Sequence, residues 1–193
     1  SEGTFYAPVQ TYRAQQARLG VLQRRLSRKH KGSRNWHKAK AKVQKLHSKI
    51  ANVRHDYLHK TANEICKNHA IIVLEDLQVR NMSASAAGTV AQPGRQVRAK
   101  SGLNKAILEQ GWAVLRHLLE YKQAWRGGLV VAVPAHYTSQ RCSTCGDTQA
   151  ANRPTQAQFC CQKCGFLCHA DVNAARNILA AGHAVIACGE DAV

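Results

Sequence analysis

Two cysteine pairs with the same spacing constrain this chain more than any other feature. Cys142 and Cys145 form one C-x-x-C pair, Cys161 and Cys164 form the second, and a glycine follows each pair directly. Fifteen residues separate the two pairs. Two such turns can direct four thiolates at one ion, and Zn²⁺ favours closed tetrahedral thiolate sites of this kind. The spacing therefore predicts a small zinc ribbon over residues 137–169.

The other four of the eight cysteines fit a metal site less well. Cys160 breaks the spacing, so we expect it to face away from the metal. Cys168 and His169 are an alternative ligand pair, but four thiolates already complete the coordination of zinc. Cys66 and Cys188 are expected to act as small apolar residues. Because the sequence has no recognisable export signal, thiolates on a metal are a better interpretation than disulfides.

The charge of the chain favours a polyanionic partner. Lys and Arg number 28 against 11 Asp and Glu, which gives a formal net charge of +17. Neutralising phosphates releases counterions and drives binding, so nucleic acid is the leading candidate. A basic protein of the membrane surface is the alternative, but the sequence has no long apolar run and no lipidation motif. We expect a soluble, cytoplasmic protein.

Two helices that form an antiparallel hairpin are predicted over residues 10–69. Apolar residues recur at helical spacing on both sides of a Gly-Ser break at Gly32. Between Gln10 and Lys60 there are fifteen Lys or Arg and one acid. Charged residues on a helix are ordinarily interpreted as a face that contacts solvent. Fifteen cations with one acid repel one another, however, and that repulsion is better tolerated when a polyanion binds beside them. The candidate nucleic-acid contacts are Arg24, Arg25, Arg28, Lys29, Arg34, Lys38, Lys42, Lys45 and Lys49.

The rest of the chain alternates between strand and helix patterns. Short apolar runs at 70–74 and 129–133 predict strands of a largely parallel sheet, with an amphipathic helix over 104–125 between them. Residues 78–104 lack apolar periodicity and are expected to form a loop. A final helix is predicted from Asp171 to Ala181. The order of elements is that of an α/β domain.

The first residues predict a turn that enters a short strand. Ser1-Glu2-Gly3 has the composition of a hairpin turn, and residues 4–7 have that of a strand. The partner strand of such a hairpin would precede Ser1, so we expect the chain to begin inside a domain.

Two carboxylates, Glu75 and Asp171, are candidates for catalytic residues because of their positions. Glu75 ends a predicted buried strand, and the carboxyl ends of such strands are where α/β folds place their sites. Asp171 stands at the start of the last predicted helix, where an ordinary N-cap is an equally good interpretation. Asp76 alternates to the other face of the strand and is expected to cap a turn.

Four segments taken in order resemble a known family. "IIVLEDL", "YTSQRCSTCG", "FCCQKCGF" and "HADVNAARNIL" resemble the carboxyl-terminal half of the TnpB (OrfB) proteins of insertion-sequence transposons. The basic hairpin and the helix "GLNKAILEQGWAVLRHLLEYK" also fall where that family has them. These proteins are prokaryotic RNA-guided DNA endonucleases related to compact CRISPR effectors, so the resemblance implies DNA and guide RNA as partners.

The resemblance implies a RuvC-like domain of the RNase H fold, formed by residues 1–136 and 170–193. The hairpin is inserted in it, and the zinc ribbon interrupts it near its end. In the family three acids bind two Mg²⁺ ions that cleave a phosphodiester. Glu75 matches the second acid and Asp171 the third.

No residue of this sequence matches the first acid, because Glu2 would lie in the turn after the missing strand. We therefore expect the chain by itself to bind zinc and nucleic acid without cutting. A binding module without catalytic activity is the second hypothesis, and a scaffold whose ribbon binds protein is the third.

Overall fold

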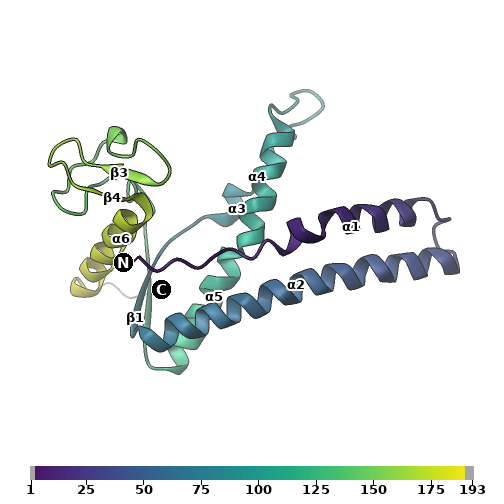
Figure 1. Ribbon diagram of the computed structural model, residues 1–193, viewed down its shortest axis with the longest axis horizontal. Helices are drawn as coiled ribbons and strands as arrows, with labels where there is room; N and C mark the ends of the chain where they lie inside the picture. The colour runs from purple at the N-terminus through teal and green to yellow at the C-terminus, as the bar shows by residue number, and fades with distance from the viewer. Residues whose placement is uncertain (1–2, 190–193) are drawn as a thin grey trace. The chain divides into compact units, whose positions relative to one another are not determined.

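The structure, a computed structural model (Figure 1), describes residues 3–189 and divides into two compact units. One unit combines the chain up to Tyr6 with Ile65–Gln78 and everything from Leu119 onward. It contains both sheets of the molecule. The other unit, Ala7–Glu64 and Val79–Leu118, is built from helices. The chain is therefore a mixed α/β protein, as the alternation of patterns predicted.

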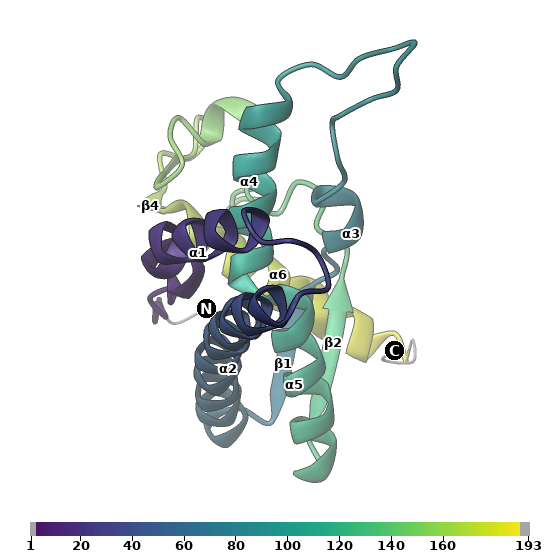
Figure 2. The same cartoon turned by 90° about the vertical axis from the view of Figure 1, so that its right-hand side faces the viewer.

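The helical unit is dominated by a hairpin of two long helices. Helix α1 (Thr11–Ser27) and helix α2 (Arg34–Asn68) lie side by side and run in opposite directions (Figures 1 and 2). The turn between them contains Gly32 at φ +85°, a conformation that favours glycine. Leu19 of α1 packs into a buried cluster with Val43, Leu46 and Ile50 of α2. These residues lie on the predicted apolar stripes, so the hairpin is confirmed.

The segment over residues 78–125 differs from the prediction in two respects. Helix α4 (Val97–Gln110) begins inside the expected loop, which also holds the short helix α3 (Val79–Met82). The single helix predicted over 104–125 is interrupted, because Gly111 adopts φ +69° and helix α5 (Trp112–Trp125) begins after it. A Cβ at Gly111 would lie 2.8 Å from Leu58 Cδ1. Apolar periodicity continues across the break, which is why the pattern concealed it.

The sheet unit is built on two parallel strands and one helix. Strands β1 (Ile71–Glu75) and β2 (Leu129–Val133) pair in parallel from Ile71 opposite Leu129 to Glu75 opposite Val133. Helix α6 (Ala170–Ala187) packs against both strands. Both strands occur where the sequence predicted them.

Residues 137–169 form a small ribbon with little regular structure. Strands β3 (Gln158–Cys160) and β4 (Leu167–His169) pair antiparallel, and a short 3₁₀ helix, η1 (Ala150–Asn152), precedes them. The core of the ribbon is Phe159, which packs with Cys142, Cys161 and Ala170. One aromatic ring and the cysteines make a very small core, which is consistent with a fold that a metal completes.

Two predictions near helix and strand ends are wrong. Residues 4–7 pair with no strand in the described chain, and a strand is defined by such pairing. The turn at Ser1-Glu2 lies outside the described residues. The N-cap of α6 is His169, whose Nδ1 accepts the N–H of Asp171 at 3.2 Å. Asp171 is therefore the second residue of the helix.

None of the helices in residues 3–189 is apolar enough over sufficient length to cross a membrane.

Candidate metal centres and nucleic-acid surface

The four cysteines of the two C-x-x-C pairs converge on one point. All four sulfurs lie within 4.8 Å of one another. The Sγ atoms of Cys142 and Cys164 are 3.7 Å apart, and those of Cys145 and Cys161 are 3.5 Å apart. Ligands at about 2.3 Å from a tetrahedral Zn²⁺ are separated by about 3.8 Å. The donor set and its spacing therefore suit zinc.

The protonation of these thiols reflects their crowding. The N–H of Cys164 is the main cause that lowers the pKa of Cys161 to about 7. An N–H from Phe166 acts to lower the pKa of Cys164, but desolvation and the three neighbouring thiols outweigh it and raise the value to about 12. Without a cation, one thiolate at this point thus disfavours ionisation of another. A divalent ion removes that conflict.

Cys160 and Cys168 lie outside this cluster. Both are partly buried, and Cys168 packs against the apolar core of the ribbon. Desolvation raises the pKa of the Cys168 thiol, which suits a packing residue rather than a ligand. Cys66 is buried as expected, whereas Cys188 is exposed at the C-cap of α6.

A buried asparagine that the sequence did not single out joins the two cysteine turns. The side chain of Asn152 is fully buried. Its Nδ2 donates to the carbonyl oxygen of Gln140 at 3.1 Å and to Asp147, and its Oδ1 accepts the N–H of Gln162 at 2.8 Å. Asp147 follows the first turn and Gln162 lies inside the second. The segment between the two cysteine pairs thus connects them through the hydrogen bonds of Asn152, and the partners of Asn152 can be identified only from the fold.

Glu75 stands at the carboxyl end of β1, as predicted. Its side chain is partly buried, and its Oε1 accepts a hydrogen bond of 2.6 Å from the hydroxyl of Thr138. The backbone of the next residue, Asp76, is held by a hydrogen bond of 2.8 Å from its N–H to the carbonyl oxygen of Val133. The side chain of Asp76 accepts a hydrogen bond of 3.2 Å from the side-chain amide of Gln78, and its role as the cap of a turn stays a prediction.

Asp171 is more exposed than Glu75 and lies beside basic groups. Its side chain is 60% exposed, and its Oδ1 is 3.6 Å from a guanidinium nitrogen of Arg153. The imidazole of His169 is 3.9 Å from the other oxygen. Within residues 3–189, the four cysteines of the two C-x-x-C pairs form a cluster in which three or more possible metal ligands lie close together. Glu75 and Asp171 do not belong to any such cluster in this part of the chain.

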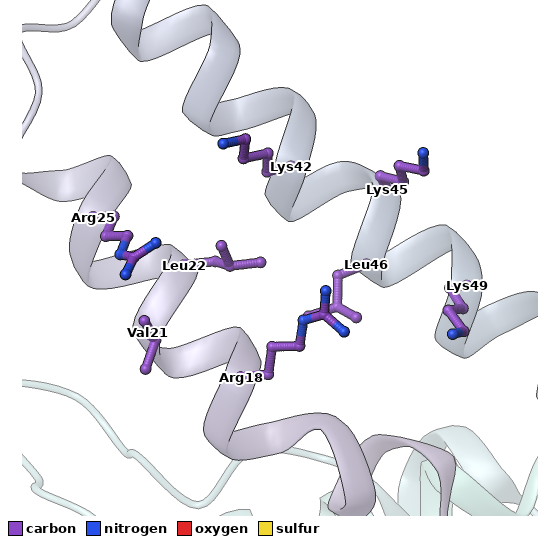
Figure 3. Close-up of a pocket in the computed structure, with 8 residues that line it drawn as sticks. All are labelled: Arg18, Val21, Leu22, Arg25, Lys42, Lys45, Leu46 and Lys49. Atoms are coloured by element: carbon purple, nitrogen blue, oxygen red, sulfur yellow. The ribbon is translucent and has the colours of Figure 1, made fainter.

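The basic hairpin carries a groove between α1 and α2. Figure 3 shows its lining residues, three apolar and five cationic. The groove measures about 620 Å³. All five cations are exposed, and none of them forms an ion pair with any residue of the described chain. The lining residues are Arg18, Val21, Leu22, Arg25, Lys42, Lys45, Leu46 and Lys49.

The nine predicted contacts divide among different places. Arg25, Lys42, Lys45 and Lys49 line the groove of Figure 3, and Arg28, Lys29 and Lys38 line an adjoining pocket with Arg25 and Lys42. Arg24 lies with Lys105 in a separate depression, and Arg34 lines none of these three. Arg18 was missed. Its spacing of four and seven residues from Leu22 and Arg25 places all three on one helix face, a signal that was available.

Comparisons with known proteins place this geometry in a family. Residues 1–86 match the family model OrfB_IS605, described as "Probable transposase", and residues 112–178 match the "Cas12f1-like, TNB domain" model. The chain is 63% identical over 98% of its length to "Putative RNA-guided DNA endonuclease InsQ" of Escherichia coli strain K12. The chain belongs to the TnpB/OrfB family.

Other relatives agree with this assignment. A relative from Streptomyces pristinaespiralis, named "Putative RNA-guided DNA endonuclease", is 39% identical over 92% of the chain. The chain spans about half the length of these proteins, 47% of the E. coli relative and 40% of the other. Among solved structures, a Cas12f1–sgRNA–target DNA complex aligns with a TM-score of 0.55 at 20% identity, covering 88% of this chain and 41% of that chain. That likeness shows the fold alone.

Proposed function

We propose that this TnpB-family chain is the RuvC-like part of an RNA-guided DNA endonuclease. Residues 1–136 and 170–193 would form a domain of the RNase H fold with the hairpin inserted, and residues 137–169 a zinc ribbon. The observation that carries the proposal is the placement of Glu75 at the carboxyl end of a parallel strand, in a family whose members are named as such endonucleases. Helix α6, which packs on that strand, supplies Asp171.

Glu75 and Asp171 are the residues that would hold Mg²⁺. Carboxylate oxygens are the hard ligands that this ion prefers. When bound, such ions activate water and stabilise the leaving oxygen of a phosphodiester. Glu75 offers Oε2, which has no hydrogen-bond partner among the described residues, while its other oxygen is held by Thr138. The side chain of Asp171 is 60% exposed, and the Arg153 guanidinium, its ion-pair partner at 3.6 Å, would have to move aside for a metal ion to bind.

Cleavage is tested in a chimera of full family length. The matching region of the E. coli relative is replaced by this chain, so that the remaining part of the relative would supply the family's first acid. With guide RNA, Mg²⁺ and target DNA, Glu75→Gln and Asp171→Asn should each lower the cleavage rate at least about 100-fold, because loss of one ligand leaves the ions under-coordinated. Glu64→Gln, on α2, is the control. Cleavage that survives Glu75→Gln would remove Glu75 from the site.

The groove of the hairpin would hold the phosphate backbone of the nucleic acid. The groove is lined by five cations without acidic partners among the described residues and by three apolar residues, Val21, Leu22 and Leu46 (Figure 3). Because charged and apolar side chains line it together, the groove can accept an unpaired strand, whose sugars and bases present apolar faces beside their phosphates. Guide RNA is the partner that the family implies.

Binding is measured by fluorescence anisotropy with single-stranded RNA. Lys45→Gln with Lys49→Gln should weaken binding about tenfold or more, because two phosphate contacts are lost. Lys60→Gln with Lys67→Gln removes the same charge from the same helix outside the groove, and it should change affinity less than threefold. Equal losses in both pairs would show that only net charge matters.

The alternative function is a nucleic-acid-binding module without nuclease activity. This alternative needs only the groove of Figure 3, whose five cations form no ion pair with any of the described residues. This alternative requires that the groove variants weaken binding while the chimera with all three acids still fails to cleave. A protein-binding scaffold, in contrast, would show no RNA affinity in the anisotropy measurement.

A further inference from the structure

The contact between Glu75 and Thr138 joins two separate parts of the sheet unit. Thr138 lies at the entrance of the ribbon, 63 residues away in sequence. Its hydroxyl is 2.6 Å from Glu75 Oε1 and 3.3 Å from the carbonyl oxygen of Ala135. A hydroxyl has one proton to donate, and the shorter distance to a carboxylate oxygen identifies the favoured acceptor. The bond fixes one oxygen of Glu75 and leaves the other without a hydrogen-bond partner among the described residues.

The backbone of Thr138 is itself held in place. Tyr137, the residue before it, adopts φ +60°, an unfavourable conformation for a residue with a Cβ. The carbonyl of Tyr137 accepts the N–H groups of Gln140 and Arg141, both at 2.9 Å. The Nδ2 of Asn177, on α6, donates to the Thr138 carbonyl at 2.8 Å. The strained turn therefore has several bonds that maintain it.

Further hydrogen bonds connect Asn177 with the first cysteine pair. Asn177 Nδ2 also donates to the carbonyl of Arg141 at 2.7 Å, and that carbonyl accepts a second bond of 2.7 Å from Asn173 Nδ2. Asn173, one turn earlier on α6, is fully buried, and its Oδ1 accepts the N–H of Ser143 at 3.0 Å. Ser143 lies inside the first cysteine turn. A set of hydrogen bonds thus runs from Ser143, between Cys142 and Cys145, through Asn173, Asn177 and Thr138 to Glu75.

From these contacts we infer that Thr138 is a positioning residue for Glu75, and that the zinc ribbon sets the position of Thr138 through Asn173 and Asn177. Zinc would thereby contribute to the orientation of a carboxylate that it does not touch. The importance of that orientation for cleavage rests on the proposed function. The contact itself does not, so the two can be tested separately.

The direct test is the carbonyl ¹³C resonance of the Glu75 side chain. The sequence contains six Glu, so selective labelling gives a simple spectrum, and the Glu75→Gln spectrum assigns the peak. In the zinc-loaded chain, Thr138→Val should displace this resonance, because the hydroxyl that donates to it is lost. Thr138→Ser keeps the hydroxyl and should retain most of the original shift.

Thr148→Val is the matched control, because it removes a hydroxyl within the ribbon that contacts no carboxylate in the described chain. It should leave the Glu75 resonance unchanged. The resonance of Glu109, in the helical unit, serves as an internal reference. Zinc content is measured for every variant, so that loss of the ribbon is recognised. An unmoved peak in Thr138→Val, or an equal shift in Thr148→Val, contradicts the inference.

The link to zinc has its own measurement. Removing zinc with a chelator should move the Glu75 resonance of the unaltered chain, and restoring zinc should return it. A resonance that ignores zinc would overturn this part of the inference. Cleavage by the chimera then separates the two proposals. Thr138→Val should lower the cleavage rate of the chimera about tenfold, and Thr138→Ser should lower it less than threefold. If the Glu75 resonance responds to Thr138→Val and to zinc but the chimera never cleaves DNA, only the proposed nuclease function is contradicted.

Discussion

At the scale of single residues, the ribbon and the candidate site depend on hydrogen bonds between residues that lie far apart in the chain, such as Thr138 with Glu75. The four cysteines and Glu75 stand where spacing and strand position indicated. Asn152 and Thr138 were not singled out, because their partners come from distant parts of the chain. Asp171 was correctly placed at the start of a helix, but His169 takes the capping role. One residue of difference at a helix end is a typical error of pattern reading.

Gly182 is a residue whose small size allows close packing in the sheet unit. It lies in α6, and a Cβ there would be 2.4 Å from the side chain of Val73 on β1. Val73 is β-branched and cannot easily rotate away. Gly182→Ala should therefore lower the free energy of unfolding by about 1–3 kcal/mol, as measured by urea denaturation. Gly102→Ala, in α4, meets open space and should stabilise its helix by about 0.5–1 kcal/mol. Similar effects at both sites would disprove the packing argument.

At the scale of elements, predictions succeeded where one periodicity described a whole segment. Both hairpin helices and both parallel strands are examples. The helix over 104–125 was wrong because Gly111 changes the backbone without interrupting the apolar spacing. The expected strand over 4–7 has no pairing partner in the described chain, and composition alone cannot supply one. Elements that depend on a backbone conformation or on a distant partner are thus the ones that sequence patterns miss.

The zinc ribbon is the element whose folding depends most on a ligand. Cys142→Ser should abolish tight zinc binding and unfold residues 137–169, because binding and folding of such a small core are coupled. Cys160→Ser, outside the cluster, should retain about one zinc per chain. Atomic emission gives the zinc content, and amide hydrogen exchange reports unfolding of the ribbon. Full zinc retention in Cys142→Ser would exclude the four-cysteine site.

Zinc affinity should increase with pH. The N–H of Phe166 acts to lower the pKa of Cys164, but desolvation and the neighbouring thiols raise it to about 12, and the pKa of Cys145 is also raised. Both thiols are protonated near neutral pH, so zinc must displace at least two protons, and one displaced proton corresponds to about a tenfold change in affinity per pH unit. Competition with a chromophoric chelator between pH 6 and 8 should therefore show about a hundredfold increase per unit. An affinity independent of pH would mean that the thiols are already ionised before zinc binds.

At the scale of the whole molecule, charge is the property that the sequence conveyed most directly. A net charge of +17 predicts attraction to any polyanion, and composition could not say where binding occurs. The fold supplies that information, because it gathers five unpaired cations along one groove while other cations, such as Lys60, pair with an acid. Location rather than total charge is therefore what distinguishes specific binding from general attraction.

The salt dependence of RNA binding distinguishes these two effects. Each phosphate neutralised on a single strand contributes about −0.7 to the slope of log K against log salt, so five groove cations give about −3.5. Lys45→Gln with Lys49→Gln should reduce the slope to about −2.1, whereas Lys60→Gln with Lys67→Gln should leave it unchanged. Anisotropy titrations at several salt concentrations measure both slopes. If the two pairs alter the slope equally, RNA is held by the diffuse field of the protein, and the groove between α1 and α2 is not its binding site.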